Sequence, residues 1–186
     1  MPAQDTSFVS KKERAQKADS LFKSGYNFFQ QRKLDEAIQS WNSASEIFTN
    51  LDEKKAVLKV YGNLALAYKI LNQMDRYRSF LDKQLKLSIQ LHDQRSQASI
   101  LSSLGMNYTN DFQYDSAKIS FDQALEIQKN INDKKEEANT YSRLGMYFQV
   151  TSDYKSALSA YQLAASIHRT GGDRAELSND LSGIGT

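Results

Sequence analysis

The side chains best suited to acid–base chemistry in this sequence are its two histidines, His92 and His168. Both lie near the predicted end of a helix, and the positions forty residues to either side of each carry no histidine. A histidine at a helix C-terminus is favoured by the helix dipole. We therefore interpret both as solvent-exposed surface side chains rather than as catalytic groups.

The sequence lacks the other usual marks of catalysis. Its candidate carboxylates are typical of solvated helix faces rather than of acid–base pairs, namely Glu13, Glu36, Glu46 and Glu126. There is no glycine-rich phosphate loop, nucleophile elbow or His-Glu-x-x-His motif. The sequence also has no cysteine, which excludes disulfides, thiolate metal sites and cysteine catalysis. These observations predict a protein that is not an enzyme and that uses no metal and no cofactor.

Charge and hydropathy narrow the class of partner. The formal net charge is +2, with both signs interspersed along the chain, so neither nucleic acid nor an anionic membrane is expected as a partner. The segment that begins Met1-Pro2-Ala3 lacks the basic start and apolar core of a signal peptide. No apolar run approaches the ~20 residues that span a bilayer. We expect a cytoplasmic protein.

A short motif recurs every forty residues and sets the organisation of the chain. The motif occurs as Ser24-Gly25-Tyr26-Asn27-Phe28, Leu64-Ala65-Leu66-Ala67-Tyr68, Leu104-Gly105-Met106-Asn107-Tyr108 and Leu144-Gly145-Met146-Tyr147-Phe148. One further step reaches Ile184-Gly185, next to the last residue. A fixed period of a few tens of residues is typical of stacked repeat proteins.

The second half of each period repeats as well. One column carries large side chains, Trp41, Leu81, Phe121 and Tyr161, and the columns on either side of it carry alanine in every repeat but the second. Small residues allow helix backbones to approach each other, while large rings fill the space between them. The second repeat has Tyr77 and Gln84 at the small positions, so we expect its helices to be pushed apart or rotated.

This alternation of Leu-Gly, an aromatic residue and small and large apolar columns resembles the tetratricopeptide repeat, over about residues 17 to 186. The resemblance implies an all-α fold, a right-handed α-solenoid (superhelix) of antiparallel helix pairs, in which four repeats are followed by a fifth A-type helix. We use A and B for the first and second helix of a repeat. The implied divisions are a tail or helix extension over 1–16, repeats over 17–52, 53–92, 93–132 and 133–172, and a partial repeat or capping helix over 173–186.

The helices themselves can be placed by the same register. We expect helices up to about residue 30 and over about 34–50, 53–71, 74–91, 94–111, 114–131, 134–151 and 154–170, with a last one from near Arg174. Acidic residues at the junctions before A helices, Glu53, Asp93, Asp133 and Asp173, are suited to accept hydrogen bonds from free helix amides.

The last helix suggests that the repeats continue. Leu177, Leu181 and Ile184 recur at helical spacing and should cover the preceding B helix, with Asp180 on a polar outer face. No further B helix follows them. We therefore expect the 186 residues to be the N-terminal piece of a longer repeat protein.

The repeat is forty residues long and lacks the proline that usually precedes the next repeat. In this it resembles the repeats of Pins-type G-protein regulatory scaffolds, kinesin light chain and bacterial repeat regulators. The resemblance implies a module of a larger regulatory protein that binds a protein or peptide on its concave face. It places a set of A-helix positions along that groove: Phe22, Tyr26, Phe29, Lys59, Asn63, Leu66, Lys69, Met106, Asn110, Asn139, Arg143, Met146 and Gln149. Apolar side chains there can anchor a partner, while Asn and Arg can bind its backbone or carboxylates.

Alternatives remain open from the sequence. Phe22, Tyr26 and Phe29 could instead be covered by the N-terminal segment or by a second copy of the chain. A clamp for a C-terminal carboxylate is disfavoured because Phe22 and Tyr26 stand where Lys and Asn are wanted, although Lys59, Asn63 and Arg143 could meet an acidic group. Besides a peptide-binding scaffold, the chain could be a self-association module that stacks through its terminal helices. Binding of nucleic acid would need a basic stripe, which the mixed charges do not favour.

Overall fold

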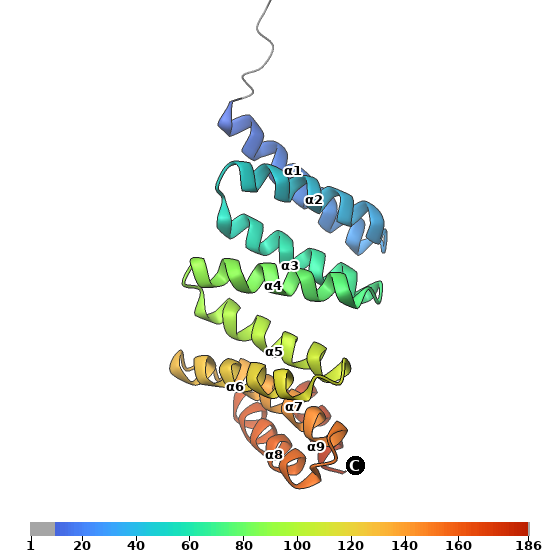
Figure 1. The fold of residues 1–186 in the computed structure, drawn as a ribbon, viewed down its shortest axis with the longest axis vertical. Coiled ribbons are helices and arrows are strands. Elements are labelled where there is room, and N and C mark those ends of the chain that lie inside the picture. Colours follow the sequence, from blue (N-terminus) through green and yellow to red (C-terminus); the bar gives the residue numbers. More distant parts are fainter. Residues whose placement is uncertain (1–9, 186) are drawn as a thin grey trace, which may run out of the picture. The chain divides into compact units, whose positions relative to one another are not determined.

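The computed structural model describes residues 10–185, and within them the chain forms nine α-helices and no strand (Figure 1). Residues 1–9 of the predicted tail, and Thr186, lie outside the described residues. The remainder of the predicted extension, from Lys11 onward, belongs to the first helix. The chain divides into two compact units, Met1–Leu87 and Ser88–Thr186.

Unit 1 contains α1 (Lys11–Gln30), α2 (Leu34–Asn50), α3 (Lys54–Ile70) and most of α4 (Met74–Gln90). Its helices follow each other as antiparallel hairpins, with α1 packed on α2 and α2 packed on α3. The start of α1 is fixed by a capping box, in which Ser10 and Glu13 each bind the other's backbone amide.

Unit 2 contains α5 (Gln94–Asn110), α6 (Tyr114–Asn130), α7 (Lys134–Val150), α8 (Tyr154–Gly171) and α9 (Arg174–Ile184). The A-type helices contact one another directly, α7 lying between α5 and α9, while α6 and α8 complete the hairpins. The predicted helix bounds agree with the structure to within one or two residues. The all-α repeat architecture is therefore confirmed, while the division into repeats at residues 52, 92 and 132 stays a prediction.

The turns explain why the period is forty residues. Each helix from α2 to α7 has 17 residues and is followed by a turn of three, whose middle residue has a positive φ. These residues recur every twenty positions, at Arg32, Asp52, Asn72, His92, Phe112, Asn132 and Ser152. In each turn the next amide bonds back to the carbonyl five residues earlier, as Glu53 does to Phe48 (2.9 Å). This closes the helix as a Schellman motif. After α8 the left-handed position is taken by Gly172 (φ 75°), as expected.

The glycine and aromatic columns face each other inside a repeat. A Cβ placed on Gly25 would lie 2.5 Å from the Trp41 ring, and one on Gly145 would lie 2.6 Å from the Tyr161 ring. Gly105 stands in the same relation to Phe121, at 2.7 Å. These rings therefore pack directly over glycine, in the space that a Cβ would take.

The second repeat accommodates its unusual residues by a local exchange. Gln84 extends toward α3, where its amide nitrogen lies 3.5 Å from the Leu58 carbonyl and 2.9 Å from the position that a Cβ on Gly62 would take. Gly62 therefore makes room for the long side chain. Tyr77 is buried as well, and α3 and α4 keep the length and register of the other pairs. Gly62 was not considered in our expectation for Gln84; that the helices of the second repeat are pushed apart or rotated stays a prediction.

Candidate functional site

In unit 1 the predicted binding residues of α1 differ in their exposure to solvent. Tyr26 is exposed (51%), whereas Phe22 and Phe29 are half-buried. The Phe29 ring lies 5.6 Å from the ring of Trp41, and the Trp41 indole donates to the Phe22 carbonyl (3.2 Å). Phe29 therefore contributes to the core of its own repeat, and Tyr26 is the freely presented aromatic side chain of this helix.

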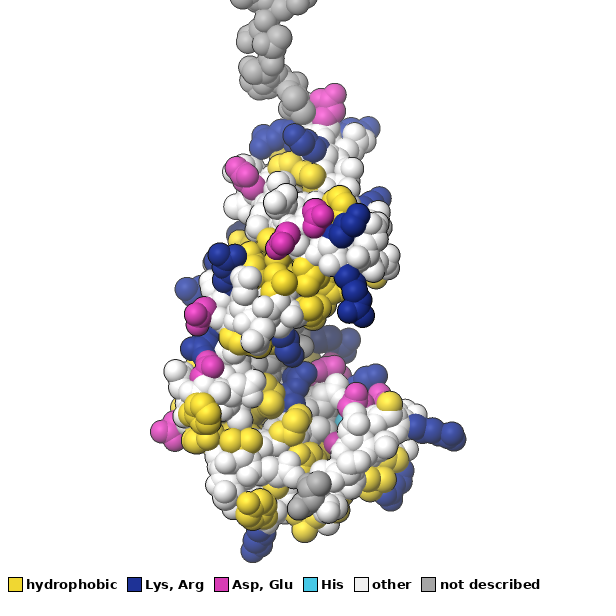
Figure 2. Space-filling model, turned by 90° about the vertical axis from the view of Figure 1, so that its right-hand side faces the viewer, with side chains coloured by type: hydrophobic (Ala, Val, Ile, Leu, Met, Phe, Trp, Pro, Cys, Tyr) yellow, Lys and Arg dark blue, Asp and Glu magenta, His cyan; other side chains and the backbone are white. Residues whose placement is uncertain are grey.

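On α3 the predicted positions are mostly open to solvent. Lys59, Leu66 and Lys69 are exposed, and Asn63 is half-buried. The Lys69 ammonium lies 5.7 Å from the centre of the Tyr77 ring, within range of a cation–π interaction. Figure 2 shows one face of the chain, on which exposed apolar side chains occur beside Lys and Arg side chains.

On unit 2 the two predicted methionines differ. Met146 on α7 is exposed (41%), whereas Met106 on α5 is half-buried against the cluster of Phe121, Leu144 and Tyr147. Asn110, at the end of α5, is exposed. Met146 is thus the methionine available to a partner, and Met106 belongs mainly to the core.

The predicted polar residues of α7 already have partners within the fold. The Arg143 guanidinium donates to the Ser102 hydroxyl (2.7 Å), which ties α7 to α5. The amide oxygen of Gln149 accepts a hydrogen bond from the Tyr161 hydroxyl (2.7 Å). Asn139 lies between Glu136 and His168. These side chains fix neighbouring helices, so only their remaining hydrogen-bonding groups could meet a ligand.

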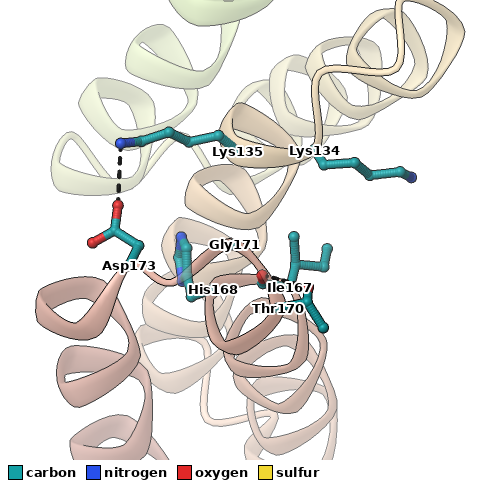
Figure 3. Close-up of a pocket in the computed structure, with 7 residues that line it drawn as sticks. All are labelled: Lys134, Lys135, Ile167, His168, Thr170, Gly171 and Asp173. Carbon is teal, nitrogen blue, oxygen red and sulfur yellow. Dashed lines mark hydrogen bonds and ion pairs between the residues drawn. The ribbon is translucent and has the colours of Figure 1, made fainter.

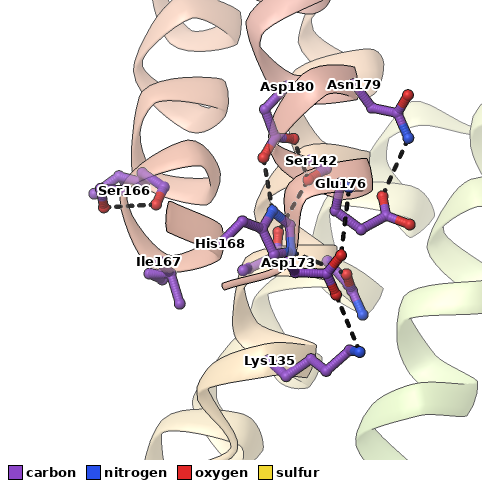
Figure 4. A network of polar contacts seen from close by, with 12 residues as sticks. Lys135, Ser142, Ser166, Ile167, His168, Asp173, Glu176, Asn179 and Asp180 are labelled. Atoms are coloured by element: carbon purple, nitrogen blue, oxygen red, sulfur yellow. Dashed lines mark hydrogen bonds and ion pairs between the residues drawn. The ribbon is translucent and has the colours of Figure 1, made fainter. Parts of the chain in front are cut away.

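A buried polar network that the sequence analysis missed joins α7, α8 and α9 (Figure 4). His168 Nδ1 lies 2.7 Å from Asp180 Oδ2, and the other oxygen of Asp180 accepts from the Ser142 hydroxyl (2.6 Å). His168 and Asp180 are only 2% and 1% exposed. Our interpretation of His168 as a surface residue, and of Asp180 as part of a polar outer face, was therefore wrong. His92, in contrast, is exposed.

The register contained a signal for this network. His168 follows Ala157, Tyr161 and Ala164 at helical spacing, on the buried stripe of α8, so α9 covers it. The same packing contradicts our prediction for Leu181, which is 49% exposed instead of covering α8.

Both ring nitrogens of His168 lie close to polar groups of the network. Besides the contact of Nδ1 with Asp180, its Nε2 lies 3.2 Å from Asn139 Oδ1, and the amide nitrogen of Asn139 donates to Glu136 Oε1 (3.2 Å). Close by, the pKa of Asp173 is lowered mainly by its bond to Lys135, then by the Glu176 amide, with a smaller contribution from His168.

The pockets of unit 2 include two whose linings consist of described residues. One of about 230 Å³ lies beside this network and is lined by Lys134, Lys135, Ile167, His168, Thr170, Gly171 and Asp173 (Figure 3). Its two lysines point in opposite directions and are both paired, Lys134 with Glu137 (2.7 Å) and Lys135 with Asp173 (3.1 Å). The other pocket, of about 440 Å³, lies between α7 and α8 and is largely apolar, with Tyr141, Phe148 and Leu163 in its lining.

Neither pocket brings together a nucleophile and a base, since the nitrogens of His168 are both engaged with Asp180 and Asn139. Within residues 10–185 there is no group of three or more His, Cys, Asp or Glu side chains placed to hold a metal ion. No helix among these residues is long and apolar enough to cross a membrane.

Models of the tetratricopeptide repeat match residues 96–170 and 58–88, together more than half of the chain. No curated protein matches the sequence. Solved structures with a similar fold include BtubC (BKLC) from P. vanneervenii, with a TM-score of 0.77 and 20% identity over 91% of this chain and 69% of that one.

Two further structures are similar over most of this chain. Aspartyl phosphate phosphatase F from Bacillus subtilis has a TM-score of 0.81 and 17% identity, over 90% of this chain and 44% of the phosphatase. A Rap protein complexed with competence and sporulation factor has a TM-score of 0.73 and 16% identity, over 92% of this chain and 48% of the Rap protein. This chain spans less than half the length of either, and at these identities the likeness concerns the fold. With its own repeats matched, the chain belongs to the tetratricopeptide repeat family of all-α helical-repeat scaffolds for protein interaction.

Proposed function

We propose that the chain is a non-catalytic module that binds an extended peptide or a helix of a partner protein in a concave groove lined by its A-type helices. The observation that carries this proposal is a repeated exposed anchor. Tyr26, Leu66 and Met146 occupy the same position of three of the four repeats, one residue after the glycine column, and are 51%, 46% and 41% exposed. Large apolar side chains left in water at the same place of several repeats are typical of an interaction surface.

The chemistry of the face suits a peptide. Phe22 and Tyr26 on α1, with Leu66 on α3, offer apolar contacts in unit 1, and Met146 offers an adaptable one in unit 2. Asn63 precedes Leu66 by three residues on α3, and Asn110 is exposed at the end of α5; both can bind a peptide backbone. A module that engages a few such anchors binds with a Kd on the order of micromolar, about −8 kcal/mol.

The similar folds support a regulatory role. The Rap protein was solved in complex with a factor, and the phosphatase contains a comparable repeat array within a chain more than twice as long as the part matched here. By analogy, we infer that this module senses or recruits a partner on behalf of a larger regulatory protein.

Self-association through the terminal helices is the second candidate. The observation that favours it is the exposure of Leu181 on α9 and of Tyr154 and Leu158 on α8, at 49%, 67% and 41%. Molecular mass measured by light scattering should then rise with concentration in the absence of any partner. A constant monomer mass would exclude this candidate and leave peptide binding in place.

Peptide selection tests the principal proposal. The full chain and a variant carrying Leu66→Asp and Met146→Asp are each used to select from a random peptide library displayed on phage. We expect families of peptides with apolar anchors that are enriched by the parent chain and not by the variant. A matched control is Leu158→Asp, which places the same charge on a B-type helix. Identical enrichment by parent and double variant would overturn the assignment of the binding face.

A further inference from the structure

The exposed side chains of α3 form an unusual set. The fully exposed residues of this helix are Lys54, Lys55, Lys59, Leu66, Lys69 and Ile70, so every one is either a lysine or apolar. Successive positions of a helix are rotated by about 100°, and from this spacing Lys55, Lys59, Leu66, Lys69 and Ile70 lie within one sector of the helix surface. We call these five residues the α3 stripe. The helix contains no acidic residue at all.

The lysines of the stripe are not neutralised by the fold. Among residues 10–185, neither Lys55 nor Lys59 takes part in a hydrogen bond or ion pair, and Lys69 meets only the face of Tyr77. Lys54, just outside the stripe, has one long ion pair, 3.9 Å to the highly exposed Asp52. Four basic residues of unit 2 do pair with carboxylates, namely Arg95, Lys118, Lys134 and Lys135.

The first turn of α3 also differs from those of the other A-type helices. In α5, α7 and α9 an aspartate side chain accepts a hydrogen bond at the N-cap, and in α1 Glu13 completes a capping box. In α3 the N-cap residue Glu53 makes no side-chain cap bond, and the first turn carries Lys54 and Lys55. A helix N-terminus disfavours cations, so these two lysines are not placed there to stabilise the helix.

We propose that the α3 stripe binds an acidic peptide segment that carries an apolar anchor, a proposal that rests on the peptide-binding function above and names its chemistry. Leu66 and Ile70 receive the anchor, and Lys55, Lys59 and Lys69 receive carboxylates on either side of it. Lys59 and Leu66 are seven residues apart, about 10 Å along the helix. An extended peptide rises about 3.3 Å per residue, so its acidic residue stands about three positions from its anchor.

The other anionic partners fit the stripe less well. A nucleic-acid surface requires basic residues spread over one face of a molecule, whereas this chain has a net charge of only +2. An anionic membrane gains about 1 kcal/mol per lysine near its surface, and one short stripe supplies few. The alternation of lysines with a central leucine matches a single short segment of protein chain.

Two short fluorescent peptides test the proposal with the full chain. Both have a central leucine and an amidated C-terminus; one carries glutamate about three positions to either side, and the other carries glutamine there. Fluorescence anisotropy should show that the glutamate peptide binds about tenfold more tightly at low salt and that raising the salt removes most of the difference. Equal affinities of the two peptides would overturn the proposal.

Charge reversal locates the site. Lys59→Glu should weaken binding of the glutamate peptide about three- to tenfold, because it replaces an attraction by a repulsion. The matched control is Lys86→Glu, the same change at an exposed lysine of α4 with no ion pair among the described residues. Equal losses in both variants would mean that overall charge, and not the stripe, attracts the peptide. Leu66→Ser should weaken both peptides, which separates the anchor from the charges.

The remaining outcomes distinguish recognition of an acidic peptide by the α3 stripe from the peptide-binding function proposed above. If single-stranded RNA or phosphatidylserine vesicles bind as tightly as the glutamate peptide and lose affinity in Lys59→Glu, the stripe serves that partner and the proposal is wrong. If neither fluorescent peptide binds while library selection on the parent chain succeeds, acidic recognition fails and peptide binding stands. If the selection fails as well, both proposals fall.

Discussion

Asp133 links two A-type helices, because its Oδ2 pairs with Arg95 Nε on α5 at 3.0 Å while its Oδ1 lies 3.5 Å from the Glu136 amide at the start of α7. Forty residues later Asp173 repeats the arrangement, pairing with Lys135 on α7 (3.1 Å) and facing the Glu176 amide on α9 (3.5 Å). An aspartate at one register position thus begins α7 and α9 and ties each of them to the A-type helix before it.

Removal of this double contact should lower the stability of unit 2 more than removal of a helix cap alone. Asp133→Ala loses the cap of α7 and the pair with Arg95, and we expect unit 2 to lose about 1–2 kcal/mol in urea denaturation. Asp153→Ala is the control, since Asp153 caps α8 through Ser156 without bridging two A helices. We expect the smaller loss there. Equal losses in the two variants would show that the pair with Arg95 contributes nothing.

Acidification should weaken the same contacts. The bond from Lys135, followed by the Glu176 amide, holds the pKa of Asp173 below its usual value. A carboxyl with a depressed folded pKa adds stability above its unfolded pKa, about 4, and this contribution is lost as the pH falls through the folded pKa. The parent should therefore exceed Asp173→Asn in thermal stability at neutral pH, and the difference should close at pH 2–3. A difference independent of pH would assign the effect of the substitution to packing.

The buried pair of His168 and Asp180 should hold α9 in place. With one partner removed, the other is left as a buried polar group with a hydrogen bond unmade, a loss of about 1–3 kcal/mol. We expect His168→Ala and Asp180→Ala to abolish the amide protection of α9 in hydrogen exchange, while amides of α5 and α6 stay protected.

The matched control for this pair is His92→Asn. His92 is exposed and has a φ of 53°, a conformation that asparagine adopts readily, so the change should leave α9 and overall stability unaltered. Retained protection of α9 in both His168→Ala and Asp180→Ala would contradict a role for the pair in docking this helix.

The sequence predicted the repeat architecture well because the period acts at several levels. The 17-residue helices, the columns of glycine opposite Trp41 and Tyr161, and the aspartate caps all follow from residues that recur every forty positions. Features outside the quoted columns were missed. His168 and Asp180 hold the register positions at which Gln128 bonds Thr140 (3.0 Å) one repeat earlier, but the residue types differ, so the columns did not reveal the contact. Gly62 likewise compensates for Gln84 from outside the columns.

The candidate binding face was predictable only as a set of positions. Register indicates which residues lie on A helices, but exposure depends on what else packs there. Met106 and Met146 hold equivalent positions, yet only Met146 is exposed, because Met106 packs against the cluster around Phe121. Phe29 is likewise drawn toward Trp41. The set of lysines and apolar residues on α3 became distinctive only once the exposure of each residue was known.

The pairing of small and large columns predicts that one destabilising substitution can be relieved by a second. Gly145→Ala places a Cβ 2.6 Å from the Tyr161 ring, closer than real contacts allow, so we expect a loss of about 1–3 kcal/mol from overpacking. Gly171→Ala is the control, since a Cβ there meets nothing within 4 Å. The second repeat shows how the strain can be relieved, because it has Ala65 in the glycine column and Leu81 in place of the ring. The double variant Gly145→Ala, Tyr161→Leu should therefore be more stable than the single variant Gly145→Ala. If the double variant instead loses the sum of what the single variants Gly145→Ala and Tyr161→Leu lose in stability, the columns do not act as a pair and the packing account of the repeat is wrong.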